Sequence, residues 1–163
     1  MPLTFRIIPQ RGLVLVDYDG FSTIEELKNA TALYLAHPDY AAGQKQLVDL
    51  TYITGFEKDY VRFMEIQAAK AERLEGAGVQ SIVVYVAPSA MAREVATLFT
   101  RTWAPTRNVV ALVQHSEAEA LELLGQPEKS IDQMLAATGH KRAHSPNNDG
   151  PVSYTHLTLP TKA

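Results

Sequence analysis

Apolar residues along this chain fall into two kinds of segment. Short runs rich in β-branched and aromatic residues predict strands, because such side chains suit a pleated sheet. Longer stretches carry apolar residues at every third or fourth position, which predicts helices with one buried face. On this basis we predict strands over 3–8, 13–18, 45–50, 81–86 and 109–113, and helices over about 23–37, 57–75, 89–103 and 116–124.

Capping residues indicate where several of these helices begin and end. Segment 22–26 (Ser-Thr-Ile-Glu-Glu) contains two overlapping capping boxes ahead of the first helix. Pro38 ends that helix, since proline cannot continue its hydrogen bonding. Ser116 with Glu119 forms a further capping box. In the second helix, one apolar stripe carries Val61, Met64, Ala68 and Ala71.

The order of the predicted elements sets the fold class. Residues 9–12 separate the first two strands, and their proline and glycine favour a tight antiparallel connection. After that, strands alternate with helices, which implies right-handed crossovers between parallel strands. Segment 45–50 shows the weak alternation that is typical of a strand covered on both faces. We therefore predict an α/β domain with a mixed β-sheet of about five strands, packed by about four α-helices.

A length of 163 residues allows one domain and a tail. We place the domain at residues 1–127 and a short helical extension at 128–139, where 131–137 continues a helical pattern. Residues 140–163 are rich in polar residues, proline and glycine, which predicts a disordered tail with a solvated basic run at 140–142. Residues 151–163 resemble a translated cloning adaptor, so we expect them to be non-native and exclude them from functional reasoning.

Composition narrows the classes of function. A net charge of -3 and a pI near 5.9 argue against nucleic acid as a partner, because phosphate binding relies on clustered Lys and Arg. The absence of cysteine excludes disulfides and thiolate chemistry. The first residues lack the pattern of a signal peptide, and no run of about 18 apolar residues predicts a membrane span. We therefore expect a cytoplasmic protein without integral membrane association.

Few residues in the predicted domain suggest catalysis. His37 falls in the last turn of a helix, where a histidine complements the helix dipole, and His115 falls in a loop. The chain contains no phosphate-binding loop, dinucleotide-binding, serine-hydrolase or zinc-binding motif. We expect no catalytic residues, no metal and no cofactor, and hence a protein that is not an enzyme.

A carboxylate cluster is one interpretation of three aspartates in the chain. Asp17, Asp19 and Asp49 would offer the oxygen ligands that hard cations prefer. Asp17 and Asp19 also suit a turn. Asp49, in a buried strand, suits the acceptance of backbone N–H groups or pairing with a base such as Arg93. We favour these structural roles.

Three segments together form a recognisable pattern. Residues 35–40 (Leu-Ala-His-Pro-Asp-Tyr) precede 46–51 (Gln-Leu-Val-Asp-Leu-Thr), and 91–93 (Met-Ala-Arg) open a later helix. Over roughly residues 3–125, the chain resembles the SpoIIAA-like branch of the STAS and SEC14-like superfamily. The resemblance implies a STAS-like fold, a bacterial origin and a regulatory role through a protein partner.

Phosphorylated members of that superfamily carry an acceptor Ser or Thr near the start of the helix that follows the third strand. Glu57 and Lys58 occupy about that place here, so the usual acceptor serine has no match. Thr51 and Thr54 are the nearby hydroxyls, and we expect them to serve in a turn or a helix cap. The sequence therefore does not favour phosphorylation-controlled anti-sigma antagonism.

Two candidate sites result. As a protein-interaction or regulatory module, the chain would contact a protein partner or a second copy through Thr51, Thr54, Phe56, Glu57 and Tyr60. An exposed apolar patch in that region would comprise Tyr52, Phe56, Tyr60 and Phe63. The alternative is a small hydrophobic ligand in a SEC14-like pocket lined by Tyr34, Phe63, Phe99 and Trp103. Core packing is a competing explanation for the aromatic residues.

Overall fold

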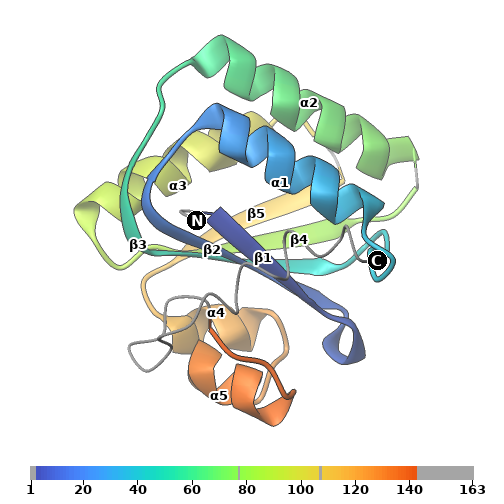
Figure 1. The fold of residues 1–163 in the computed structure, drawn as a ribbon, viewed down its shortest axis with the longest axis vertical. Helices are drawn as coiled ribbons and strands as arrows, with labels where there is room; N and C mark the ends of the chain where they lie inside the picture. The colour runs from blue at the N-terminus through green and yellow to red at the C-terminus, as the bar shows by residue number, and fades with distance from the viewer. Residues whose placement is uncertain (1–2, 77, 107, 143–163) are drawn as a thin grey trace.

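Five strands form one sheet with helices on both sides (Figure 1). The structure is a computed structural model, and it describes residues 3–76, 78–106 and 108–142. The strands are β1 (Leu3–Ile8), β2 (Leu13–Ser22), β3 (Lys45–Phe56), β4 (Ser81–Val86) and β5 (Val109–Gln114). The helices are the 3-10 turn η1 (Pro9–Arg11), α1 (Ile24–Ala36), α2 (Tyr60–Gly76), α3 (Ala90–Trp103), α4 (Glu117–Leu123) and α5 (Ile131–Ala137).

The strands follow one another across the sheet in chain order. β1 is antiparallel to β2, whereas β2, β3, β4 and β5 are mutually parallel. Because parallel crossovers are right-handed, the connecting helices α1, α2 and α3 all lie on one face (Figure 1). α4 and α5 cover the other face. The predicted α/β fold class with a mixed five-stranded sheet is confirmed.

Each face of the sheet has its own hydrophobic core. Beneath α1, α2 and α3 the core is aromatic, with Phe99 and Trp103 of α3 packed near Tyr85 of β4. On the other face, aliphatic residues of α4 and α5 pack on Leu47 and Val84. β3 and β4 bury side chains in both directions, as the weak alternation of 45–50 predicts.

Local capping explains where α1 begins. Thr23 Oγ1 accepts the N–H of Glu26 at 3.2 Å, and Glu26 Oε1 accepts the N–H of Thr23 at 2.7 Å. Of the two predicted capping boxes this one forms, while Ser22 is buried at the end of β2. At the other end of α1, His37 Nδ1 accepts the N–H of Asp39 at 3.0 Å. His37 therefore has a structural role at the helix end.

β2 and β3 run further than predicted. β2 continues to Ser22 and β3 to Phe56, so Asp17 and Asp19 lie in a strand and the predicted turn is wrong. The β2–β3 register shifts after Asp17 and again after Gly20, whose φ of 87° favours glycine. These irregularities interrupt the period-two pattern, which explains why the sequence places the strand ends too early.

α2 turns a different side to the sheet from the predicted one. Of its predicted apolar stripe only Ala71 is buried, and Val61 is 73 % exposed. The inner side instead carries Phe63, Gln67 and Lys70. This helix therefore buries Gln67 and half-buries Lys70 beside the core residues Phe63 and Ala71, while Val61 and Met64 are exposed, which departs from the usual pattern of an amphipathic helix.

Helix α5 lies within the predicted helical extension at 128–139. The described residues continue past α5 to Arg142. The C=O of Leu135 accepts the N–H of His140 at 2.8 Å. Arg142, expected in a solvated run, is buried. Residues 143–163, which include the rest of the predicted tail and the adaptor-like segment, lie outside the described residues. Among the helices of the described ranges, none combines the length and apolar character needed to cross a membrane.

Candidate functional site

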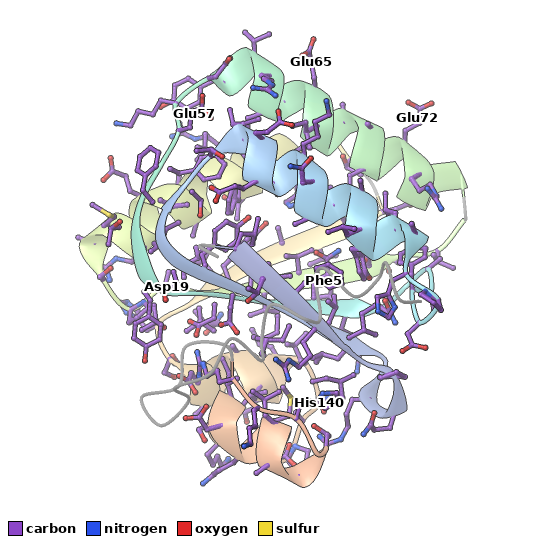
Figure 2. All side chains as sticks on the ribbon, viewed as in Figure 1. Phe5, Asp19, Glu57, Glu65, Glu72 and His140 are labelled. Carbon is purple, nitrogen blue, oxygen red and sulfur yellow. The ribbon has the colours of Figure 1, made fainter. Side chains whose placement is uncertain are left out.

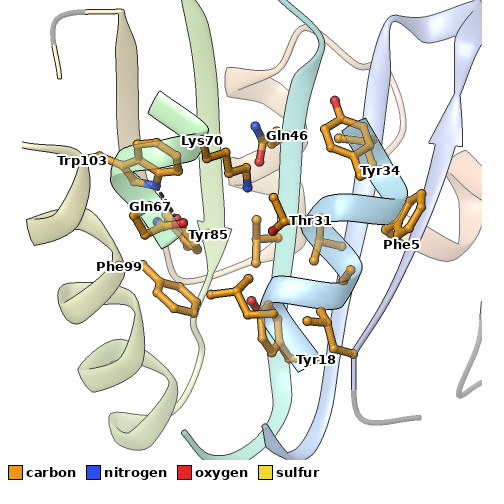
Figure 3. Close-up of a pocket in the computed structure, with 16 residues that line it drawn as sticks. Phe5, Tyr18, Thr31, Tyr34, Gln46, Gln67, Lys70, Tyr85, Phe99 and Trp103 are labelled. Carbon is orange, nitrogen blue, oxygen red and sulfur yellow. Dashed lines mark hydrogen bonds between the residues drawn. The ribbon is translucent and has the colours of Figure 1, made fainter. Parts of the chain in front are cut away.

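A cavity lies between the sheet and the helices α1, α2 and α3 (Figure 3). Residues of β1, β2, β3 and β4 form one side of it, and residues of the three helices form the other. Its free volume is about 50 Å³ and it opens to solvent. Since one water molecule needs about 10–15 Å³ of such space, the cavity has room for about three to five waters or a ligand of similar bulk.

Three of the four predicted ligand-pocket residues line this cavity. Tyr34 comes from α1, and Phe99 and Trp103 come from α3. Phe63 does not line it, because its ring packs at 5.2 Å against both Phe56 and Phe99. Helical spacing of aromatic residues therefore identifies inward-facing positions, whereas tertiary packing decides which of them border empty space.

Hydrogen bonds hold parts of the aromatic wall in place. Trp103 Nε1 donates to the hydroxyl of Tyr85 at 2.9 Å, and the hydroxyl of Tyr34 donates to Gln44 Oε1 at 2.6 Å. Burial raises the pKa of Tyr34 and Tyr85, so both hydroxyls remain protonated donors at neutral pH. The shape of the cavity is thus largely preformed.

Two polar side chains at the cavity lack such bonds. Lys70 extends from α2 into the space near Thr31 and Gln46 (Figure 3), with its Nζ 5.5 Å from the centroid of the Trp103 ring. Within the described ranges, its amine has neither a hydrogen bond nor an ion pair, and the side-chain amide of Gln46 has no hydrogen bond. Burial lowers the pKa of Lys70 to about 8. Both side chains therefore offer hydrogen-bond donors to an occupant of the cavity.

The predicted partner-interface residues do not share one surface. Phe56 is 5 % exposed and belongs to the core, so its prediction as a surface contact is corrected. Thr51 and Glu57 are half-buried and bonded within the chain. Thr51 Oγ1 donates to Asp49 Oδ1 at 2.5 Å, and Glu57 Oε1 accepts the N–H of Ile24 at 2.9 Å. The Thr51 hydroxyl thus has a structural role within β3, and the Glu57 carboxylate has one at the start of α1.

Thr54 and Tyr60, the other two candidates, are exposed. Tyr60, Val61 and Met64 are 51 %, 73 % and 44 % exposed, and we call these three residues the α2 surface. Tyr60 and Met64 also border a hollow between α2 and α3. Glu65 on the same helix points away from the sheet (Figure 2). An exposed apolar area therefore exists near the predicted patch and shares Tyr60 with it, whereas Phe56 and Phe63 of that patch are buried.

A buried ionic cluster, which the sequence did not reveal, joins the sheet to the end of the described chain. Asp17 and Asp49 are partners in the β2–β3 register, and both are buried. Arg142 forms an ion pair with Asp49 and lies 3.6 Å from Asp17. The expected partner Arg93 instead donates to the C=O of Pro88 at 3.2 Å. The sequence offered one signal for this cluster, because both aspartates stand beside apolar strand residues. A carboxylate that is buried in such a position requires a cation.

The described residues offer binding groups rather than a metal centre. Within them, no set of three or more His, Cys, Asp or Glu side chains is placed to hold a metal ion. Among the described lining residues of the cavity there is no histidine and no carboxylate. What the cavity supplies is therefore one amine, a few amides and hydroxyls, and aromatic or aliphatic walls.

The sheet, its two helical layers and the cavity define an α/β domain of mixed-sheet type. No protein-family model matches the chain, and no curated protein matches it. Among solved structures, the chain is similar to the anti-sigma factor antagonist SpoIIAA in its unphosphorylated form, with 13 % sequence identity and a TM-score of 0.44. This match covers 76 % of this chain and 97 % of the SpoIIAA chain.

Proposed function

We propose that this protein is a non-enzymatic regulatory domain of the bacterial cytoplasm whose cavity binds a small hydrophobic ligand. The observation that supports this most directly is the cavity itself, bordered by Tyr34, Phe99 and Trp103. Ligand sites combine mostly apolar walls with a few placed polar groups, and this cavity has both. The hydrogen bonds of Trp103 and Tyr34 fix the walls in advance, which lowers the cost of ordering them on binding.

Benzyl alcohol is a suitable neutral probe of this function. Because Trp103 is the only tryptophan of the chain, one indole N–H signal in a ¹H–¹⁵N correlation spectrum reports on the cavity wall. We expect that signal to shift saturably as benzyl alcohol is added. Ala30→Phe should abolish the shift, since Ala30 lines the cavity and the larger ring would fill it.

The control is Ala32→Phe, which adds the same ring at an exposed position of α1. It should bind benzyl alcohol as the unaltered protein does. A titration without saturation, or equal binding by Ala30→Phe and the unaltered protein, would contradict the proposed ligand site.

The α2 surface favours a second candidate function, a protein-interaction module. Val61 is 73 % exposed, and it lies beside Tyr60 and one helical turn from Met64. Clustered exposed apolar residues of this kind mark interaction surfaces. For this second function, the partner would be another copy of the chain, and the α2 surfaces of the two copies would cover each other.

Val61→Glu tests this candidate by placing a charge in the centre of the α2 surface. Sedimentation equilibrium of the unaltered protein should show a concentration-dependent dimer, and Val61→Glu should remain a monomer with stability changed by less than about 0.5 kcal/mol. Leu123→Glu is the matched control, because Leu123 is 44 % exposed on α4, on the other face of the sheet. A protein that is monomeric at every concentration would exclude the dimer.

A further inference from the structure

We propose that the cavity binds a small carboxylate, with the carboxyl group held by Lys70 and Gln46 and the apolar body against the aromatic wall. This inference rests on the proposed ligand function and specifies the chemical class of the ligand. It is carried by two hydrogen-bond donors that face an apolar cavity without a protein acceptor among the described residues.

In the protein without a ligand, the position of the Lys70 amine costs free energy, because its charge has no counter-charge within the part of the chain that the structure describes. A lysine near the surface usually extends its amine into water, but here the amine lies inside, over the ring of Trp103. The ring face compensates a cation only in part. Burial lowers the pKa of Lys70 to about 8, so the amine still carries its charge at pH 7. An anion in the cavity would supply the missing counter-charge.

The neighbouring groups favour a carboxylate over other anions. Lys70 provides the only cationic side chain among the described lining residues, which suits a ligand with a single negative charge. A phosphate monoester would carry close to a second charge that the cavity does not balance. The amide of Gln46 can donate to the second carboxylate oxygen, since a carboxylate accepts several hydrogen bonds.

The size of the cavity limits the apolar body. With a free volume of about 50 Å³, it encloses a body about as large as three to five water molecules, and because it opens to solvent a larger ligand can extend out of it. The rings of Tyr18 and Phe99, whose centroids are 5.7 Å apart, both line the cavity and can contact an aromatic ligand. Benzoate therefore matches the site in charge, and its ring can lie partly in the cavity and partly in the opening to solvent.

Benzoate and benzyl alcohol form a charged and a neutral probe with the same ring. In calorimetric and NMR titrations of the whole protein at pH 7, benzoate should bind about tenfold more tightly than benzyl alcohol. The reason is that benzoate gains a charge-assisted hydrogen bond from Lys70, which benzyl alcohol cannot form. Lys70→Met, which keeps the length of the side chain, should weaken benzoate binding by about tenfold. The same change should leave benzyl alcohol binding within about twofold.

Lys58→Met is the matched control, because Lys58 is exposed and lies outside the cavity. Lys70→Met should fold, since it removes an unpaired charge from a half-buried side chain, and Lys70→Gln provides a second neutral variant. Equal affinity for both probes in the unaltered protein would overturn the carboxylate inference while the ligand function stands. Benzoate binding unchanged in both Lys70 variants would also overturn it. Failure of both probes to bind would overturn the ligand function as well.

Discussion

Replacing Phe99 with alanine is expected to lower the free energy of unfolding by about 3–5 kcal/mol. The Phe99 side chain is 3 % exposed, and its ring lies at centroid distances of 5.2–5.7 Å from those of Tyr18, Phe56, Phe63 and Tyr85. Alanine would remove all four ring contacts and leave a void beside the existing cavity. Urea unfolding, followed by tryptophan fluorescence, measures the loss.

Phe21→Ala is the control, because it removes the same ring from a side chain that is 55 % exposed. Its cost should stay below about 1 kcal/mol. If the two substitutions cost the same, the aromatic cluster around Phe99 would not be the centre of the core.

Arg142→Met is expected to cost about 3–5 kcal/mol at pH 8, because it breaks a buried ion pair by removing one partner. The Arg142 side chain is 6 % exposed, and it sits between the carboxylates of Asp17 and Asp49, which are 5 % and 0 % exposed. Methionine would fill much of the space but would deprive both carboxylates of this cation. The two carboxylates are adjacent in the sheet, so their mutual repulsion would also increase.

The effect of Arg142→Met should depend on pH. Burial raises the pKa of Asp17 from 3.8 to about 6, and Arg142 opposes this increase by favouring the charged form. A carboxyl group that holds its proton more tightly when folded contributes less stability as the pH rises between its two pKa values, here from about 4 to about 6. Without Arg142 the folded pKa rises further, so this loss extends to higher pH. The deficit of the variant should therefore be larger at pH 8 than at pH 5.

Urea unfolding at both pH values tests this expectation. Lys141→Met is the control, because it removes a positive charge from an exposed neighbour and should cost less than about 0.5 kcal/mol. Adding Asp17→Asn to Arg142→Met should restore part of the stability at pH 8. An Arg142→Met deficit of equal size at pH 5 and pH 8 would show that charge burial is not its cause.

Much of the fold follows from local signals in the chain. The β-branched run 81–86 and the helical pattern 131–137 coincide with β4 and α5, and Thr23 caps α1 as its capping box predicts. These features depend on neighbouring residues only, so a single sequence contains the information that specifies them. Once the strand order is known, the right-handed crossover rule places α1, α2 and α3 on one face.

The orientation of α2 could not be predicted in this way. Val61 and Met64 of its predicted apolar stripe face outward, while Gln67 and Lys70 face the cavity. A periodic pattern assigns the most apolar stripe to the core, and that rule fails where a helix lines a polar-edged cavity. The departure from the pattern coincides with the residues on which both proposed sites depend.

The ionic cluster could not be predicted for a different reason. Asp49 and Arg142 lie far apart in the sequence, and no local pattern connects a strand centre with a segment beyond α5. Their pairing is a purely tertiary contact. The same holds for Lys70 and Trp103, which come from different helices and meet only because both helices cover the same face.

The order of the strands has a consequence for how the chain folds during synthesis. Each strand pairs with the one made just before it, so the sheet can grow from β1 to β5 as the chain emerges. The face beneath α1, α2 and α3 is covered along the way, whereas α4 and α5 emerge only after all five strands. Until then Leu13, Leu47 and Val84 remain open to water or to chaperones. During synthesis, one face of the sheet is therefore covered by helices before the other face is.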